Sequence, residues 1–488
     1  METAAFEPSM LLAILPEIGL VVLALTLLVF DLVWKDQRCG RLGLYTAAGV
    51  TVLAILSIIF SRPAAEPQLI FGGMLRLDAA GFVFRMIFLI GAGLTALFAI
   101  KQDDLCLHGE FYVLMLISTL GLCLMASSAD IIMLYLSIET ASIPLYALAG
   151  FLIRDKKSVE AGIKYLLFGA MTSAVMLYGF SLMYGFTGTT QLYQLAQGFE
   201  AGNVPFLPLA AASLMVLVGF GFKVSAVPFH FWAPDVYEGS ATPVAAFLST
   251  ASKAAGFAVL LRVLLALFPS HVGQIWPVTI AILSGVSMIV GNLLAMNQKN
   301  IKRLLAYSSI AQAGYILIGV AAGTEIGISA AIYYLMSYLV TNMAAFGLVA
   351  IVGQAVGSDD LDAYAGLSRR APLLGLVMLV SLLSLGGVPP FAGFFGKLWV
   401  FGAAVESGMA WLAILGALNS VAALYYYLRV LKVVYLDRSP DEKLSFKLVP
   451  PWVFALVVCV AGILVLGFLF APWYGWATQA AQAFAFLN

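Results

Sequence analysis

Apolar runs of about 20 residues recur along the whole chain, from Leu11 to Phe486. A helix needs about 20 such residues to cross the hydrocarbon core of a bilayer, and a spanning chain must satisfy its backbone hydrogen bonds internally. The sequence therefore predicts an all-α integral membrane protein embedded in the lipid bilayer. Only 10% of its 488 residues are charged, and no polar block between the runs is long enough for a soluble domain.

About 14 transmembrane helices are predicted from these runs. Their ranges are 11–34, 42–61, 78–100, 111–127, 131–153, 158–184, 206–227, 241–268, 276–296, 304–322, 326–352, 372–404, 410–436 and 450–471. An even number of spans places both termini on the same side of the membrane.

The loops differ in charge on the two sides of the predicted membrane. One side carries 15 Lys and Arg in its loops, including Lys35 and Lys443, whereas the other side carries only Arg62 and Arg76. Because loops rich in Lys and Arg stay in the cytoplasm, both termini are predicted on the periplasmic or equivalent side. Basic and acidic residues are equal in number, 25 each, so charge gives no argument for a nucleic-acid partner.

The cysteines give no sign of a cofactor on this chain. The four residues lie far apart, and none has the close spacing of a zinc, iron–sulfur or haem site. We therefore expect no metal site and no redox cofactor on this chain.

Charged residues inside the apolar spans are the main candidates for function. They are Lys164, Lys223, Lys253 and Lys397, with Glu139 as the matching acid. A charge at the bilayer centre costs about 2.5–3.5 kcal/mol. Four unpaired lysines would thus cost about 10 kcal/mol, as much as the net stability of a domain. We expect them to face a protein interior that holds water or counter-charge, where a desolvated lysine can exchange its proton.

The other intramembrane charges have simpler explanations. Arg262 lies near an end of its span, where a long side chain can extend to the headgroups, and Arg85 can pair with Asp78 or with another helix. The lysines, too, could form static ion pairs that only fix helix packing. His230 is a candidate proton relay or a structural hydrogen-bonding group.

Proline clusters interrupt two of the spans. KVSAVPFHFWAPDVYEGS (223–240) contains Pro228 and Pro234, and LSLGGVPPFAGFFGKLWVF (383–401) contains Pro389 and Pro390. Proline removes a backbone donor, so both segments predict broken helices with free polar groups inside the membrane. The alternative is a pair of packing kinks.

The two breaks predict an inverted repeat. Pro228 and Pro389 are 161 residues and five spans apart, and an odd number of spans reverses the orientation of equivalent helices. We expect two inverted five-helix repeats, at 111–268 and 276–436. Helices before them occupy 1–110, and a last helix lies in 437–488. Such repeats are typical of secondary transporters.

Four segments carry a resemblance to a known family. They are VPFHFWAPDVYEGSATPVAAFLSTASKAAGFAVLLRVL (227–264), NIKRLLAYSSIAQAGYILIG (300–319), EAGIKYLLFGAMTSAVMLYG (160–179) and GGVPPFAGFFGK (386–397). Over about residues 75–435 the chain resembles the antiporter-like membrane subunits of respiratory complex I. It is most similar to the N-type branch, because M-type members typically have Glu in place of Lys397 and L-type members carry a long lateral helix. The segment LPEIGLVVLALTLLVFDL near the start also looks N-like.

The resemblance implies roles for the charged residues. Glu139 would be the acid that pairs with Lys223, Lys253 the central relay and Lys397 the terminal lysine of the exit. Lys164 would tune the charge of Lys223 or join the relay. Gln312 is a candidate relay position at which many bacterial members have His and photosynthetic-type members often have Gln.

The resemblance also implies a setting for the chain. It would be a proton-translocating, multi-pass subunit of NADH-quinone oxidoreductase in the bacterial inner membrane, with no redox chemistry of its own. NADH, FMN, iron–sulfur clusters and quinone would be used by other subunits. Its neighbours would be the M-type and K-type subunits and the lateral helix of the L-type subunit.

Other functions remain open from the sequence. The chain could be a Mrp-type cation/proton antiporter subunit, or the homologous subunit of a ferredoxin-dependent photosynthetic complex or of a membrane-bound hydrogenase. A third reading is a structural spacer in the membrane arm whose lysines form static ion pairs.

Overall fold

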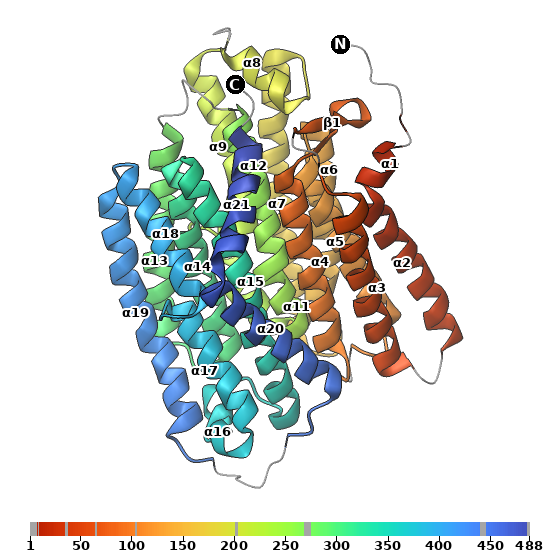
Figure 1. Cartoon of the computed structure of the whole chain (residues 1–488), viewed down its shortest axis with the longest axis vertical. Coiled ribbons are helices and arrows are strands. Elements are labelled where there is room, and N and C mark those ends of the chain that lie inside the picture. Colours follow the sequence, from red (N-terminus) through yellow and green to blue (C-terminus); the bar gives the residue numbers. More distant parts are fainter. Residues whose placement is uncertain are drawn as a thin grey trace.

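The computed structural model describes residues 7, 9–34, 38–63, 66–102, 105–200, 204–267, 275–439 and 446–485. Helices make up nearly all of this part (Figure 1). The strands are β1 (Gln68–Ile70) and β2 (Leu75–Leu77), which pair antiparallel with Gln68 opposite Leu77. The prediction of an all-α membrane protein is thereby confirmed.

The helices of the first half follow the apolar runs closely. They are α1 (Ser9–Ala13), α2 (Leu15–Val33), α3 (Arg38–Phe60), α4 (Ala79–Ala99), α5 (Gly109–Ser127), α6 (Ile131–Ala149), α7 (Lys156–Thr187), α8 (Leu192–Glu200), α9 (Phe206–Val224), α10 (Trp232–Gly239), α11 (Thr242–Phe247) and α12 (Lys253–Leu267). A π-helical turn, Leu248–Ser252, joins α11 to α12, so these three form one span.

The helices of the second half follow the same pattern. They are α13 (Ile275–Met296), α14 (Ile301–Ala322), α15 (Glu325–Val356), α16 (Leu367–Arg370), α17 (Pro372–Gly386), α18 (Ala392–Glu406), α19 (Ala410–Tyr435), α20 (Pro450–Phe468) and α21 (Phe470–Ala485). Short 3₁₀ turns lie at Phe71–Gly73 and Leu361–Tyr364.

Polar side chains fix where several spans begin. The N-cap residues that accept a hydrogen bond from their own helix are Asp78 (α4), Asp130 (α6), Asp155 (α7), Asn300 (α14) and Thr324 (α15). Such a cap satisfies amide groups that have no partner inside the helix. The sequence therefore specifies helix starts as well as helix lengths.

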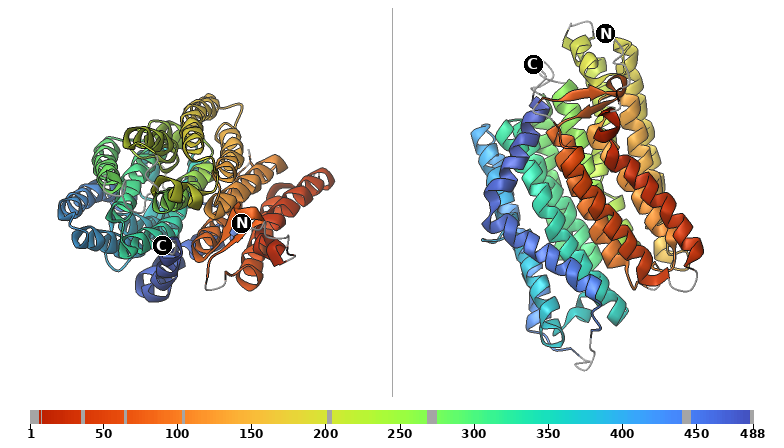
Figure 2. Two further views of the ribbon diagram at one scale, coloured as in Figure 1. Left: turned by 90° about the horizontal axis from the view of Figure 1, so that it is seen from above. Right: turned by 45° about the vertical axis from the view of Figure 1, so that its right-hand side comes forward.

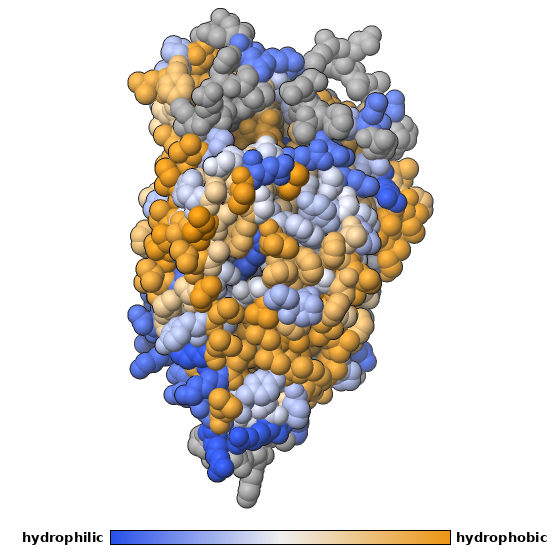
Figure 3. Space-filling view, turned by 60° about the vertical axis from the view of Figure 1, so that its left-hand side comes forward, coloured by the Kyte–Doolittle hydropathy of each residue, from blue (hydrophilic) through white to orange (hydrophobic). Residues whose placement is uncertain are grey.

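Thirteen helices of the described part are long and apolar enough to cross a membrane. The run predicted as a single span at 372–404 is divided into α17 and α18, which are shorter. Hydrophobic residues cover the middle of the face shown in Figure 3, and hydrophilic residues concentrate toward its ends. This is the surface expected of a helix bundle in a bilayer.

Both interrupted helices end in the same local conformation. Ser225 after α9 and Gly387 after α17 adopt left-handed backbone conformations, with φ of 59° and 81°. The next amides, of Ala226 and Val388, bond back to Gly221 and Leu383, which closes each helix end. The breaks then contain Pro228, and Pro389 with Pro390, as predicted from the sequence.

Pro234 differs from the expectation. We predicted that it would help to break the helix, but it lies in the first turn of α10. Proline is tolerated there because the first amides of a helix need no partner inside that helix.

The two ends of the bundle differ in their loops. Lys302 lies 3.4 Å from Asp359, and Lys157 and Arg303 both bind Glu238, so these loops share one end, which we call the basic end. It is the lower end in Figure 1, near α16. The β1–β2 pair lies at the opposite end, the hairpin end, together with α1 and the last turns of α21. Lys35 and Lys443 lie outside the described residues.

The last two helices follow one bent path along the outside of the bundle (Figure 2). The sequence predicted a single span at 450–471, but α20 ends at Phe468 and α21 continues to Ala485. The joint packs against the second helix break: a Cβ atom on Gly467 would lie 2.2 Å from the carbonyl oxygen of Pro390. Glycine permits this close approach.

Candidate functional site

Lys223 lies in the last turn of α9, where the first broken helix ends, and is buried. Its Nζ donates a hydrogen bond to Ser142 Oγ on α6, at 2.6 Å. Ser142 in turn donates to the carbonyl of Ile138 in its own helix. The ammonium group is therefore held at the helix break by a neutral acceptor.

Glu139 lies on α6, one turn before Ser142, and is half-buried. Its carboxylate accepts a hydrogen bond from Ser173 on α7. Although a pair with Lys223 was expected, none of the ion pairs within 4.0 Å among the described residues joins these two. The structure brings the acid and the lysine to the same place, with serines between them.

A small cavity lies between these groups. Its volume is about 10 Å³, and its lining includes Ser142, Tyr146, Thr172, Ser173 and Lys223. A site of this size with several polar partners has room for about one water molecule. A water molecule in this cavity could therefore link Lys223 to Ser173, which binds Glu139.

Lys253 lies at the junction of the π-helical turn and α12, and it is buried. Its Nζ donates to the carbonyl oxygen of Ser309 at 2.9 Å and to the Oγ of the same residue. α12 also packs on α9, since a Cβ atom on Gly256 would lie 3.0 Å from Lys223 Cβ. Lys253 thus lies between the first break and α14.

Lys397 lies on α18, just after the second break, and is buried. Its Nζ donates to the carbonyls of Leu385 and Gly386 at 3.0 and 3.1 Å and to Ser420 Oγ at 2.8 Å. The ring centroid of Tyr315 is 4.5 Å from the same nitrogen. The last carbonyls of a helix have no partner within it, so the break supplies acceptors for the lysine.

Gln312 connects these two lysine sites through α14. It is buried, and its Nε2 donates to the Leu385 carbonyl at 3.0 Å and to Tyr427 Oη at 3.2 Å. It lies one turn beyond Ser309, the partner of Lys253. The partner of Lys253 and the residue that shares the Leu385 carbonyl with Lys397 are therefore one helical turn apart on α14.

The hydroxyl groups of this arrangement were not predicted from the sequence. Ser142, Ser173, Ser309, Ser420 and Tyr427 bind the charged residues or Gln312, yet none was singled out. A serine inside an apolar span is weak evidence for a functional role, because such a serine commonly bonds to a carbonyl of its own helix.

Lys164 is in a different environment from the other three lysines. Its side chain is 36% exposed and forms ion pairs with Asp235 at 2.6 Å and Glu160 at 2.7 Å. Arg303 binds both Asp235 and Glu238, and Lys157 also binds Glu238. The structure thus places Lys164 in an ion-pair network at the basic end, which ties α10 to α7 and α14.

Two carboxyl groups of this network, those of Asp235 and Glu238, lie on α10, outside the spanning helices. Burial alone would raise the pKa of Asp235, but hydrogen bonds from Lys164 and Arg303 outweigh it and lower that pKa. Burial would likewise raise the pKa of Glu238. Hydrogen bonds from Lys157 and Arg303 outweigh this effect, so the pKa of Glu238 is also lowered. Both groups are therefore charged at neutral pH.

His230 lies in the first break and is buried, with its ring 4.4 Å from that of Phe231. Its Nδ1 has no hydrogen-bond partner among the described residues. Among the described residues, none of the hydrogen bonds of Lys223, Lys253 and Lys397 involves His230.

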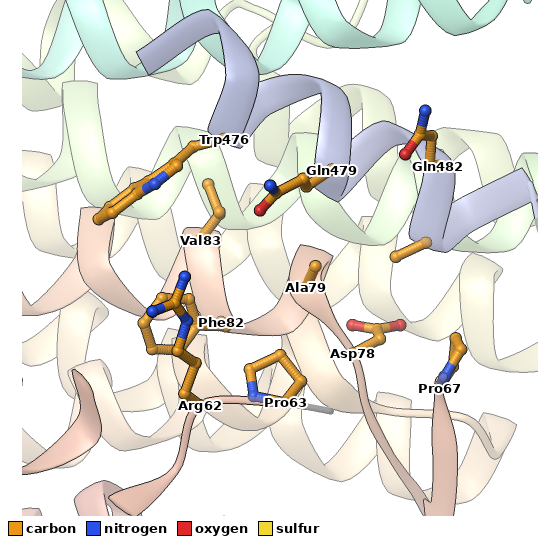
Figure 4. A pocket seen from close by; sticks show the side chains of 11 residues that line it. Arg62, Pro63, Pro67, Asp78, Ala79, Phe82, Val83, Trp476, Gln479 and Gln482 are labelled. Carbon is orange, nitrogen blue, oxygen red and sulfur yellow. The ribbon is translucent and has the colours of Figure 1, made fainter. Parts of the chain in front are cut away.

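The remaining buried charges are paired near the hairpin end. Arg262 does not extend to the headgroups as predicted, because both its terminal nitrogens bind Asp78, at 2.8 and 3.0 Å. Arg76 also contacts Asp78, at 3.2 Å. Arg85 pairs with Glu17 at 2.8 Å. A cavity of about 370 Å³ adjoins Asp78 (Figure 4), and none of the predicted site residues lines it.

No group of three or more metal-ligating side chains suited to a metal ion occurs among the described residues. The amines, the carboxylate and the hydroxyl groups of the site can each accept or donate a proton.

Sequence comparison identifies close relatives. Residues 128–423 match the family described as NADH:quinone oxidoreductase/Mrp antiporter, transmembrane. NADH-quinone oxidoreductase subunit N of Heliobacterium modesticaldum is 42% identical, over 95% of this chain and 97% of that protein. NAD(P)H-quinone oxidoreductase subunit 2 of Synechococcus elongatus is 40% identical, over 97% of this chain and 93% of that protein.

Solved structures give the same grouping. A chain of respiratory complex I from Thermus thermophilus superposes with a TM-score of 0.79 at 36% identity, over 94% of this chain and 98% of that one. A chain of the Mrp complex from Dietzia sp. superposes with a TM-score of 0.85, over 97% of this chain and 99% of that one. At 20% identity, this second match shows a common fold.

Proposed function

The chain belongs to the NADH:quinone oxidoreductase/Mrp antiporter transmembrane family, and from this premise we infer that it is a proton-translocating membrane-arm subunit of NADH-quinone oxidoreductase. Relatives with that printed name are about 40% identical over nearly the full chain. The Mrp complex shares the fold at much lower identity, so the relatives favour the quinone reductase over the antiporter. The identity to the cyanobacterial subunit leaves the electron donor, NADH or ferredoxin, to experiment.

The observation that carries the proposal is the linked set of buried lysines. Lys253 and Lys397 have no carboxylate partner among the described residues, and neutral acceptors hold both. Static packing would be better served by apolar side chains, since each uncompensated charge at this depth costs about 2.5–3.5 kcal/mol. We infer that the lysines occupy these positions, despite this cost, because they transfer protons.

The proposed cycle starts at Glu139 and Lys223. Quinone reduction in other subunits would change the position of Glu139 relative to Lys223. Two unit charges about 4 Å apart interact by about 4 kcal/mol at an effective dielectric constant of about 20. Moving one charge across 100 mV needs about 2.3 kcal/mol. The interaction energy lost when the pair separates is therefore large enough to release a proton from Lys223.

The released proton would pass to Lys253 and then to Lys397. Ser309 and Gln312 would lie between the two, and Ser142 and Ser173 would hold Lys223 and Glu139 once that pair has separated. Lys164 would act on Lys223 indirectly, by fixing α10. His230 would be a further proton acceptor at the first break.

The wider assignment follows from the same proposal. Residues 111–268 and 276–436 would be the two inverted repeats, flanked by 1–110 and 437–488. Both termini would face the periplasm. The neighbours would be the M-type and K-type subunits and the lateral helix of the L-type subunit, and NADH, FMN, iron–sulfur clusters and quinone would be bound elsewhere in the complex.

A Lys223→Ala variant tests the proposal. In membrane vesicles with the assembled complex, we expect pumping and coupled quinone reduction to collapse together. Lys299→Ala is the matched control, because this lysine is exposed at the basic end. Wild-type turnover and pH gradient in the Lys223→Ala variant would reduce Lys223 to a packing residue.

A further inference from the structure

Polar groups surround Lys397 itself, whereas apolar groups lie one turn farther along α18. The helix runs from the second break toward the hairpin end (Figure 1). At the level of Lys397 lie the Leu385 and Gly386 carbonyls and Ser420. One turn farther along the same face of α18 lies Phe401.

Phe401 closes the space beyond the lysine with residues of two other helices. Its ring meets that of Tyr315 edge-on, with centroids 6.3 Å apart and an interplanar angle of 65°. On α19, a Cβ atom on Gly416 would lie 2.6 Å from Phe401 Cε1 and 3.1 Å from Ile318 Cδ1. The ring therefore fits where Gly416 has no side chain, and α14, α18 and α19 converge on it.

Around the Phe401 ring the polar group of this layer is the Tyr315 hydroxyl, which accepts a hydrogen bond from Asn292 Nδ2 at 3.2 Å. Phe401, Ile318 and Gly416 have no polar side-chain atom, whereas the layer below provides three hydrogen bonds to Lys397. Water in a protein interior needs several polar partners, and apolar constrictions in membrane proteins block ions by excluding water. The layer separates the polar site of Lys397 from the hairpin end.

We propose that Phe401, seated on Gly416 and Ile318, is an apolar gate between Lys397 and the hairpin end of the bundle. This proposal rests on the proposed function, in which Lys397 is the last proton carrier. A proton leaves Lys397 toward this end only when the ring moves. The second break contacts the lysine directly, because a Cβ atom on Gly387 would lie 2.8 Å from Lys397 Cδ.

The test is a passive proton leak. Vesicles that contain the assembled complex are given an imposed pH gradient without substrate, and its decay is followed for Phe401→Ala, Phe401→Leu and Gly402→Ala. Gly402 is the matched control, since a Cβ atom there meets nothing within 4 Å. We expect decay several-fold faster than wild type in Phe401→Ala, intermediate decay in Phe401→Leu and wild-type decay in Gly402→Ala. Phe401→Leu keeps the test valid if the alanine variant fails to assemble.

The double variant Lys397→Ala/Phe401→Ala separates this proposal from the proposed function. Loss of the leak in the double variant supports a gate on the Lys397 path. A leak that persists without Lys397, or tight vesicles with both Phe401 variants, overturns the gate. If Lys397→Ala alone pumps like wild type, the proposed function fails as well, which a failure of the gate alone would not show.

Discussion

Gln312 and Lys397 donate hydrogen bonds to the same oxygen atom, the carbonyl of Leu385, each at 3.0 Å. That carbonyl is in the last turn of α17 and has no partner within its helix. One backbone atom therefore joins α14, which holds Lys253 through Ser309, to the second helix break. A substitution of Gln312 should therefore affect the hydrogen bonding of Lys397, and a substitution of Lys397 should affect that of Gln312.

Gln312→Leu should weaken the link between Lys253 and Lys397. The variant removes a buried donor to Leu385 and Tyr427, and an unsatisfied buried partner costs about 1–3 kcal/mol. We expect pumping to fall while assembly is retained, measured as the pH gradient per quinone reduced in vesicles. Gln298→Leu is the control, because this amide bonds only to the Leu294 carbonyl near the surface. A wild-type ratio in Gln312→Leu would exclude this residue from the path.

Ser142→Ala should slow coupled turnover. Ser142 accepts the hydrogen bond from Lys223, and a bond to a charged group contributes about 1.5–3 kcal/mol, so we expect a loss of about 10- to 100-fold. Thr140→Val on the same helix is the control, since its hydroxyl bonds to its own helix at the surface. In the double variant with Glu139→Gln, the two effects should not add, because both act on Lys223. Additive losses would mean that Ser142 acts independently of the acid.

Asp235→Asn should lower the free energy of unfolding by the same amount at every pH between 5 and 9, because it weakens the attachment of α10. Because the folded-state pKa of Asp235 is lowered, its stabilising effect is complete above the pKa of the unfolded chain, about 3.9. It is lost only as the pH falls through the lower, folded-state pKa. We expect a loss of about 0.5–1 kcal/mol, since the pair is partly exposed. Thermal unfolding in detergent at several pH values measures it, and a difference that fades between pH 7 and 5 would contradict the lowered pKa.

Asp78→Asn should destabilise the chain more than Arg262→Met. The asparagine variant leaves Arg76 and Arg262 buried without a counter-charge, at about 3–5 kcal/mol, whereas the methionine variant leaves Arg76 to neutralise Asp78. The amount of assembled subunit that survives graded heating distinguishes the two. A smaller loss in Asp78→Asn than in Arg262→Met would show that Asp78 acts mainly as the N-cap of α4, a role that asparagine can retain.

The spans and the breaks could be predicted from the sequence because both depend on local chemistry. The length of an apolar run sets the length of a spanning helix, and Pro228, Pro389 and Pro390 remove backbone donors wherever they stand. Pro234 shows the limit of this reasoning, since its effect depends on whether a new helix starts just before it.

The partners of the charges could not be predicted, because they come from helices far away in sequence. Lys164 and Lys223 look alike as lysines in apolar spans, yet Asp235 meets the first and Ser142 the second. Arg262 lies 184 residues from Asp78. Such pairings depend on how the helices pack, and helix periodicity alone does not fix that packing.

The contact between Lys253 and Ser309 also constrains how the chain is made. Ser309 follows Lys253 by 56 residues, and Lys302, which binds the Ser240 carbonyl, follows that residue by 62. At about 5–20 residues per second, the ribosome needs about 3–12 s to deliver these partners. During that interval Lys253 lacks its acceptor on α14, and the Ser240 carbonyl lacks its bond from Lys302. The first half of the chain can therefore complete these contacts only after α14 has been synthesised.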